Sequence, residues 1–259
     1  MASLHGIFVW LYRSGNQGLI MRISSIIATG VCLLVATGLA GAATFTLYGT
    51  GFSNTGTLLS GGSKDGNWTL ISDPGGSVST PATPFVTDGS AILPIFDTFP
   101  FGSNDWLQDT SASEWISPKA HETTSDPAGD YAYEETFSLT GLELSSVVIT
   151  GKWSADNSGD ILINGIPVTG GAGTIPPDAG EFKSFTSFVL NSSNADFQSG
   201  TNTIEFLVVN NTNGSPNVTG VNVDIESTFA DPVPEPASFT LMGLGLSALC
   251  LGARKWKRR

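Results

Sequence analysis

The chain has 259 residues and a formal net charge of −12. Its acids lie almost entirely in the interior, where the basic residues are only Lys64, Lys119, Lys152 and Lys183. Nucleic-acid binding needs lysine and arginine to neutralise phosphates, so this composition argues against a nucleic-acid partner. The two cysteines, Cys32 and Cys250, lie in apolar runs near the ends. The interior therefore has no disulfide, thiolate nucleophile or cysteine-bound metal.

The first element is an apolar run at 23–39, which follows Met21 and an arginine. A positive start, an apolar middle and a small-x-small exit are typical of a secretory signal peptide, which the Sec translocon exports. The small residues Ala40 and Ala42 predict cleavage after Ala42, with the next alanine as the alternative. We expect residues 1–42 to be this leader, with the true start at Met21. The alternative, a transmembrane anchor, is disfavoured because the run is short and ends in small residues.

From 43 to 230 short apolar runs alternate with turns rich in Gly, Ser, Asn and Pro, which is typical of an all-β domain. Residues 221–226 alternate apolar and polar side chains, which predicts a strand with one face buried. The run 203–209 predicts a central strand, and 161–163 followed by Asn164-Gly165 predicts a hairpin. Further strands are expected at 44–47, 131–139, 147–153 and around Phe182, Phe185 and Phe188. Looser structure is expected at 51–127. The fold class predicted is a two-sheet antiparallel sandwich.

Few residues of this domain suit catalysis. Its one histidine, His121, lies in a polar segment, and no nucleophile elbow, zinc-protease motif or phosphate-binding glycine loop is present. Glu134 and Glu135 are adjacent, so in a strand they point to opposite faces and do not flank one sugar bond. We therefore expect a protein that is not an enzyme. The alternative is a secreted carbohydrate-active enzyme that uses another pair of carboxylates.

Two groups of residues are candidates for ligand binding. Asp156, Asn157 and Asp160 place oxygen atoms on a glycine-containing turn, as calcium sites do, although an ordinary turn rich in Asp and Asn is the favoured alternative. No other cofactor is expected. Trp106 and Trp115 lie among acids in predicted loops, where their rings could stack on sugar. The alternative for both tryptophans is a place in the core.

The C-terminal end combines three features in order. Pro234-Glu235-Pro236 precedes an apolar stretch at 237–253 that is just long enough for a transmembrane helix. A basic cluster then ends the chain: Arg254, Lys255, Lys257, Arg258 and Arg259. These charges predict a cytoplasmic C-terminus and an exported domain.

This tail, 231–259, resembles the PEP-CTERM sorting signal of Gram-negative surface proteins. The resemblance implies processing by an exosortase near Pro234-Glu235-Pro236. It also implies transit through the inner membrane and delivery to the cell surface or to the extracellular or biofilm matrix. The same tail occurs on some ice-binding proteins, but the domain shows no repeated Thr-x-Thr ladder.

A second resemblance covers residues 113–226. The motifs 115–118, 129–133, 155–157 and 161–165 are similar in order to the passenger domain of many PEP-CTERM proteins and, more distantly, to galactose-binding-like jelly rolls. The resemblance implies a jelly roll at 43–230 that binds or is associated with exopolysaccharide. Glu135 departs from the pattern because it puts a carboxylate on an apolar face, for which a β-bulge or an edge position is the simplest explanation.

Overall fold

The computed structural model describes residues 45–76, 78–87, 106–120, 125–177, 181–212, 217–233 and two further glycines. Gly41–Val233 is one compact unit, and Met1–Ala40 with Pro234–Arg259 is another, in which only Gly243 and Gly245 are described, both as helical. Apart from these glycines, the predicted signal peptide, sorting motif and transmembrane helix lie outside the described residues. Within the described residues, no helix has the length and apolar character needed to cross a membrane.

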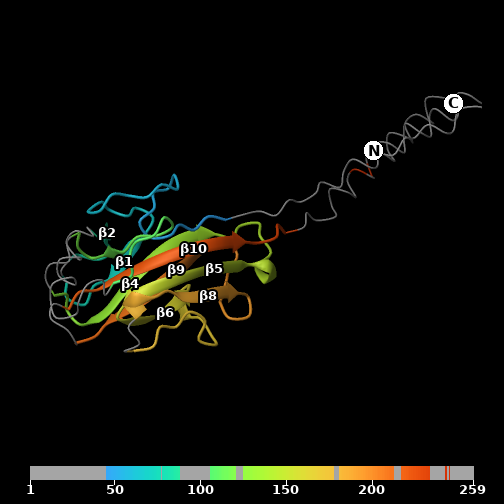
Figure 1. Ribbon diagram of the computed structural model, residues 1–259. Helices are drawn as coiled ribbons and strands as arrows, with labels where there is room; N and C mark the ends of the chain where they lie inside the picture. Colours follow the sequence, from blue (N-terminus) through green and yellow to red (C-terminus); the bar gives the residue numbers. More distant parts are fainter. Residues whose placement is uncertain are drawn as a thin grey trace, which may run out of the picture. The chain divides into compact units, whose positions relative to one another are not determined.

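The described residues form two antiparallel five-stranded sheets (Figure 1). The first sheet has the order β1 (Thr69–Ser72), β4 (Gly129–Ser138), β9 (Thr201–Asn210), β6 (Ser158–Ile163) and β7 (Ile166–Pro167). The second has the order β2 (Phe85–Val86), β3 (Ile116–Ser117), β10 (Gly220–Phe229), β5 (Val148–Asp156) and β8 (Thr186–Asn191). Two single 3-10 turns are η1 (Leu144–Ser146) and η2 (Glu181–Lys183).

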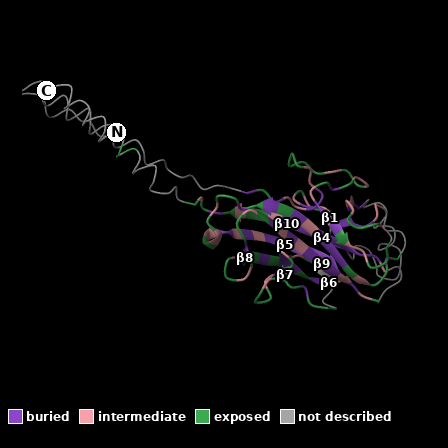
Figure 2. Ribbon diagram, turned by 180° about the vertical axis from the view of Figure 1, so that it is seen from behind, coloured by how far each residue is buried: buried purple, intermediate pink, exposed green. Residues whose placement is uncertain are grey.

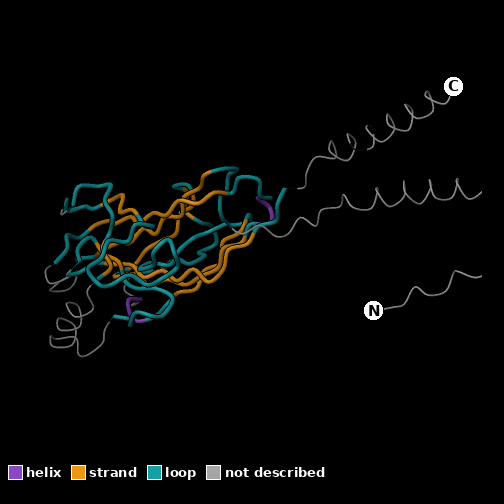
Figure 3. Tube along the Cα trace, turned by 90° about the horizontal axis from the view of Figure 1, so that it is seen from above, coloured by secondary structure: helices purple, strands orange, loops and turns teal. Residues whose placement is uncertain are grey.

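The core lies between the two sheets, which form separate layers in Figure 3. Phe206 of β9 contacts Trp153 of β5 edge-on at 5.0 Å between ring centroids, and it also contacts Phe188 of β8 and Trp68. Figure 2 shows the buried residues along the strands. Burial of these large aromatic and aliphatic side chains is the main stabilising contribution to the domain. The predicted all-β sandwich is thereby confirmed.

Two of the predicted strands are confirmed in detail. The 203–209 run lies within β9, which is central in its sheet. Asn164 and Gly165 join β6 to β7 with φ angles of 54° and 75°, the left-handed values that a two-residue hairpin turn requires.

The strand predicted at 44–47 is wrong, because residues 45–47 form no strand. Phe45 and Leu47 are nevertheless buried in the core. Side chains bind this segment in place of a neighbouring strand: Thr228 Oγ1 donates to the Phe45 carbonyl at 2.6 Å, and the N–H of Tyr48 donates to Glu135.

Glu135 points toward the core side of β4, between Tyr133 and Phe137. No bulge explains it, since the pairing of β4 with β9 is regular through this residue. The pairing of β4 with β1 ends at Glu134, so at Glu135 the N-terminal segment takes the place of a strand. Both carboxyl oxygens accept from the N–H of Tyr48, at 3.0 and 3.1 Å. The edge-position explanation is therefore the better one.

Candidate functional site

Trp106 and Trp115 are buried, with only 5% and 2% of their surfaces exposed. Their rings pack on each other with centroids 4.2 Å apart and an interplanar angle of 37°. Trp106 Nε1 donates to Asp156 Oδ2 at 3.0 Å, and Trp115 Nε1 donates to the Leu107 carbonyl at 2.7 Å. The structure therefore corrects the prediction of ring faces exposed in loops: these rings form a small core of their own, together with Val218.

The candidate calcium ligands are bonded to protein donors. The buried Asp156 accepts from Trp106 and from the Asn157 amide, while Asn157 Oδ1 accepts from the N–H of Asn211 at 3.0 Å. Asp160, on the next strand, accepts from Thr174 Oγ1 at 2.9 Å. Across the described ranges, no three acidic, histidine or cysteine residues are arranged to hold a metal. Calcium binding stays a prediction.

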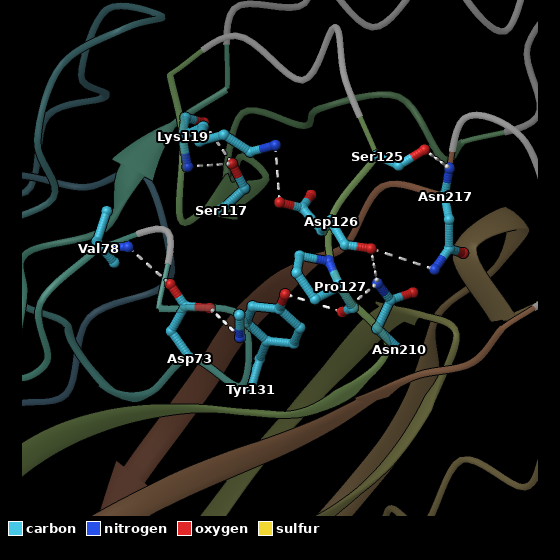
Figure 4. Close-up of polar contacts among 11 residues, drawn as sticks. Asp73, Val78, Ser117, Lys119, Ser125, Asp126, Pro127, Tyr131, Asn210 and Asn217 are labelled. Atoms are coloured by element: carbon cyan, nitrogen blue, oxygen red, sulfur yellow. Dashed lines mark hydrogen bonds and ion pairs between the residues drawn. The ribbon is translucent and has the colours of Figure 1, made fainter.

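A polar network connects two loops at one end of the domain (Figure 4). Lys119 Nζ lies 2.7 Å from the buried Asp126 Oδ1, and the N–H of Asp126 donates to the Asn217 carbonyl. Asn210 Nδ2 and Tyr131 Oη both donate to the Pro127 carbonyl, at 3.2 and 2.9 Å. These contacts join the two ends of the β3–β4 loop to each other and to the β9–β10 loop, so the network holds the two loops together.

An open pocket of about 260 Å³ lies between a short hairpin-like loop and the turn before β1. Its lining combines an aromatic ring, an aliphatic side chain, a hydroxyl and two amides: Phe52, Ser53, Asn54, Leu59, Gly66 and Asn67. Phe52 bridges to Leu58, and the N–H of Leu59 donates to the Gly51 carbonyl at 2.8 Å, which closes the loop on itself. Its volume suits one or two sugar rings rather than a large cofactor.

Hydrogen bonds fix the two walls of this pocket against each other. Asp65, which is fully buried, accepts from the N–H of Gly51 through Oδ2 at 2.7 Å and from the N–H of Asn67 through Oδ1 at 3.1 Å. Asn67 Nδ2 donates across the pocket to the Phe52 carbonyl at 2.7 Å. One carboxyl and one amide thus tie both walls together, so the pocket is formed before any ligand arrives.

Two carboxyl groups with raised pKa values lie against Gly51, the residue before Phe52 of the pocket lining. Burial raises the pKa of Asp65 to about 6, against the lowering effect of its two N–H donors. Burial, together with the charges of Asp109 and Asp65, raises the pKa of Glu114 to about 7. Glu114 packs against Gly51, where an added Cβ would lie 2.7 Å from Oε2, so Asp65 and Glu114 lie on either side of one glycine.

Sequence reasoning missed this site. Phe52, Asp65 and Glu114 carry no motif, and they are brought together only by the fold. Of the buried carboxyl groups in this region, only Glu135 was noticeable in the sequence, because it interrupts an apolar strand face. Burial raises its pKa to about 9, the Tyr48 N–H lowers it, and the charge of Asp65 adds to the increase.

Comparison with known proteins identifies the end of the chain. Residues 232–259 match the PEP-CTERM protein-sorting motif. The chain carries a PEP-CTERM sorting motif. Such a motif implies an exported protein that crosses the membrane, is processed by an exosortase and is sorted to the cell surface.

No curated protein matches the chain. Among solved structures, one similar chain is described as "Structure of a family 35 carbohydrate binding module from an environmental isolate". It is 13% identical, with a TM-score of 0.25, over 44% of this chain and 78% of that one.

Proposed function

We propose that this PEP-CTERM protein is a non-catalytic surface or matrix protein whose β-sandwich binds exopolysaccharide at the pocket beside Phe52. The sorting motif supports the location, because a sorted protein meets the polysaccharides outside the cell. The preformed pocket with an aromatic wall and two amides is the observation that carries the binding role.

The chemistry of the pocket suits a neutral sugar. The half-buried Phe52 ring offers an apolar face to the C–H side of a pyranose, while Asn54, Asn67 and Ser53 offer hydrogen-bonding groups to its hydroxyls. The acidic residues Asp65 and Glu114, which lie against the neighbouring Gly51, disfavour an anionic ligand.

The strand connections support a jelly roll. From β4 to β6 and again from β8 to β10, consecutive strands lie in opposite sheets, which is the pattern expected when a long hairpin wraps around a sandwich.

Replacing the aromatic wall tests the binding role. We expect the full chain, purified in a detergent without sugar groups, to be retained on immobilised exopolysaccharide from the producing cells. Phe52→Ala should weaken that binding about tenfold, since it removes the stacking surface. The matched control is Phe229→Ala, which removes an exposed ring from the end of β10 and should leave retention unchanged. Equal retention of the two variants would contradict the assignment.

A second candidate function is glycoside hydrolysis by Asp65 and Glu114, whose electrostatic coupling beside a pocket favours it. The geometry supports binding more strongly, because Asp65 is fully buried and both of its oxygens accept from backbone N–H groups. Incubating the polysaccharide with wild type and with Asp65→Asn separates the two: hydrolysis predicts new reducing ends that the variant loses, and binding predicts none from either.

The finer steps of export are also part of the proposal. We expect cleavage after Ala42 and near Pro236, with the apolar stretch 237–253 held in the inner membrane of a Gram-negative cell until the exosortase acts. Intact mass of the protein from a host with an active exosortase should show that both ends are lost. A retained C-terminal helix would mean an ordinary membrane anchor.

A further inference from the structure

The outer face of the second sheet carries polar residues in paired rows. β5 and β10 place Asp156 beside Gly220, Ser154 beside Asn222 and Lys152 beside Asp224. The alternation of these residues with buried valines predicts a face open to water. In the structure this face is covered instead: Ser154 and Asn222 are fully buried, and Asp156 and Asp224 are 6% exposed.

An aromatic cap lies over the end of these rows that contains Gly220 and Asp156. The cap consists of Trp106, Leu107, Trp115 and Phe182, which form a separate apolar cluster with Val218. Trp106 lies directly over β10, since a Cβ on Gly220 would be 3.0 Å from its Cη2 atom. Pairing of Ile116 with Val221 makes Trp115 the neighbour of Asn222 on the β3 side.

The arrangement does not account for the buried amide of Asn222. It has no exposed surface, and within the described part of the chain neither its amide nitrogen nor its amide oxygen has a hydrogen-bond partner. Removing a carboxamide from water without replacing its hydrogen bonds is unfavourable. A ligand that both donates and accepts would satisfy it.

We propose that the outer face of β5 and β10, beneath the Trp106–Trp115 cap, is a second binding site, and that it takes a neutral sugar residue. A sugar hydroxyl can donate to the oxygen of Asn222 and accept from its nitrogen. The indole rings supply the apolar surface that the C–H face of a sugar packs against. None of the residues that line the pocket belongs to this site, so binding at the two places is tested separately.

Charges at the site disfavour an anionic ligand. Asp156 and Asp224 lie on either side of the Asn222 row and repel anions. Lys152 is already engaged, with its Nζ 3.2 Å from Asp224 and 3.3 Å from Glu226. The unsatisfied amide has both a donor and an acceptor, and a sugar hydroxyl can satisfy each of them.

A sugar reaches the face only when the cap lifts. Trp106 is tied to this face by its hydrogen bond to Asp156, and within the cap the N–H of Leu107 donates to the Phe182 carbonyl at 2.6 Å. Opening exchanges these bonds and the ring contacts for contacts to the sugar, and it changes the environment of both indoles. Tryptophan fluorescence therefore reports binding directly.

The test is a fluorescence titration of the full chain, in detergent without sugar groups, with the methyl glycosides of glucose, galactose and mannose. Wild type should give a saturable change with at least one of them. Asn222→Leu should weaken that binding at least about tenfold, because the amide contacts are lost. The same variant should unfold at a higher temperature, since an unsatisfied carboxamide is replaced by an apolar side chain of similar size. Loss of binding with a raised midpoint cannot come from misfolding.

Two further variants complete the design. Asn222→Ala, which has no bulk to clash, should lose binding in the same way. Phe52→Ala should keep the fluorescence response, and this separates the capped site from the pocket. The inference is overturned if wild type shows no saturable change with any of the three glycosides, or if both Asn222 variants bind within about threefold of wild type.

Discussion

Glu135→Gln is expected to abolish the loss of stability of this domain between about pH 7 and about pH 9. The folded protein holds a proton on Glu135 up to a pKa of about 9, whereas the unfolded chain releases it near the ordinary value of 4.5. The folded state therefore binds more protons, and the free energy of unfolding falls as pH rises through this window. One such proton corresponds to a slope of about 1.4 kcal/mol per pH unit.

The upper part of this window isolates Glu135. Asp65, Glu114 and Asp156 also have raised pKa values, of about 6, 7 and 7. Their contributions to the free energy of unfolding are therefore lost mainly below about pH 7, before Glu135 loses its proton. Urea unfolding at several pH values measures the slope. Glu134→Gln is the matched control, because it changes the adjacent carboxylate on the other face of β4 and should retain the slope. An unchanged slope in Glu135→Gln would mean that this carboxyl is ionised in the folded protein.

Gly159→Ala is expected to destabilise the domain by at least about 3 kcal/mol or to prevent folding. Gly159 lies in β6 against the central strand β9, and a Cβ there would be 2.0 Å from the Leu207 carbonyl oxygen and 3.0 Å from the Trp153 ring. Neither neighbour can move easily, since one is strand backbone and the other is a fully buried indole whose Nε1 donates to the Gly173 carbonyl at 2.6 Å. Thermal and urea unfolding measure the loss.

Gly66→Ala is the control for this prediction. Nothing lies within 4 Å of a Cβ at Gly66, so the change should leave the unfolding midpoint unchanged or slightly raise it. If Gly159→Ala unfolds at the same denaturant concentration as Gly66→Ala, the close packing of β6 on β9 is incorrect.

Local pattern was enough to predict much of the fold. Alternation at 221–226, the apolar run at 203–209 and the Asn164-Gly165 turn each depend on neighbouring residues, and the structure confirms all three as strand or turn. The 44–47 segment failed because its apolar alternation reflects burial alone: its backbone is held by Glu135 and Thr228, which lie far away in sequence.

The sites depended on contacts that no local pattern contains. Trp106 and Asp156 were singled out for different ligands, yet the fold joins them by a hydrogen bond. The polar side chains that alternate along β10 predicted a face open to water. The cap over this face comes from Trp106 and Trp115, more than a hundred positions earlier in the chain, and from Phe182 of η2. The pocket likewise needs Asp65 to connect two segments, and an isolated aspartate in a glycine-rich stretch gives no sign of that role.

The most direct test of sugar binding is to map amide chemical shifts of the isotope-labelled protein during titration with oligosaccharide fragments of the exopolysaccharide. The amides of the pocket residues, 52–54, 59 and 66–67, should show large and saturable changes in chemical shift. Phe52→Ala should remove these changes. If saturating oligosaccharide leaves these amides unshifted, the pocket is not the polysaccharide site and the proposed function of the pocket is contradicted.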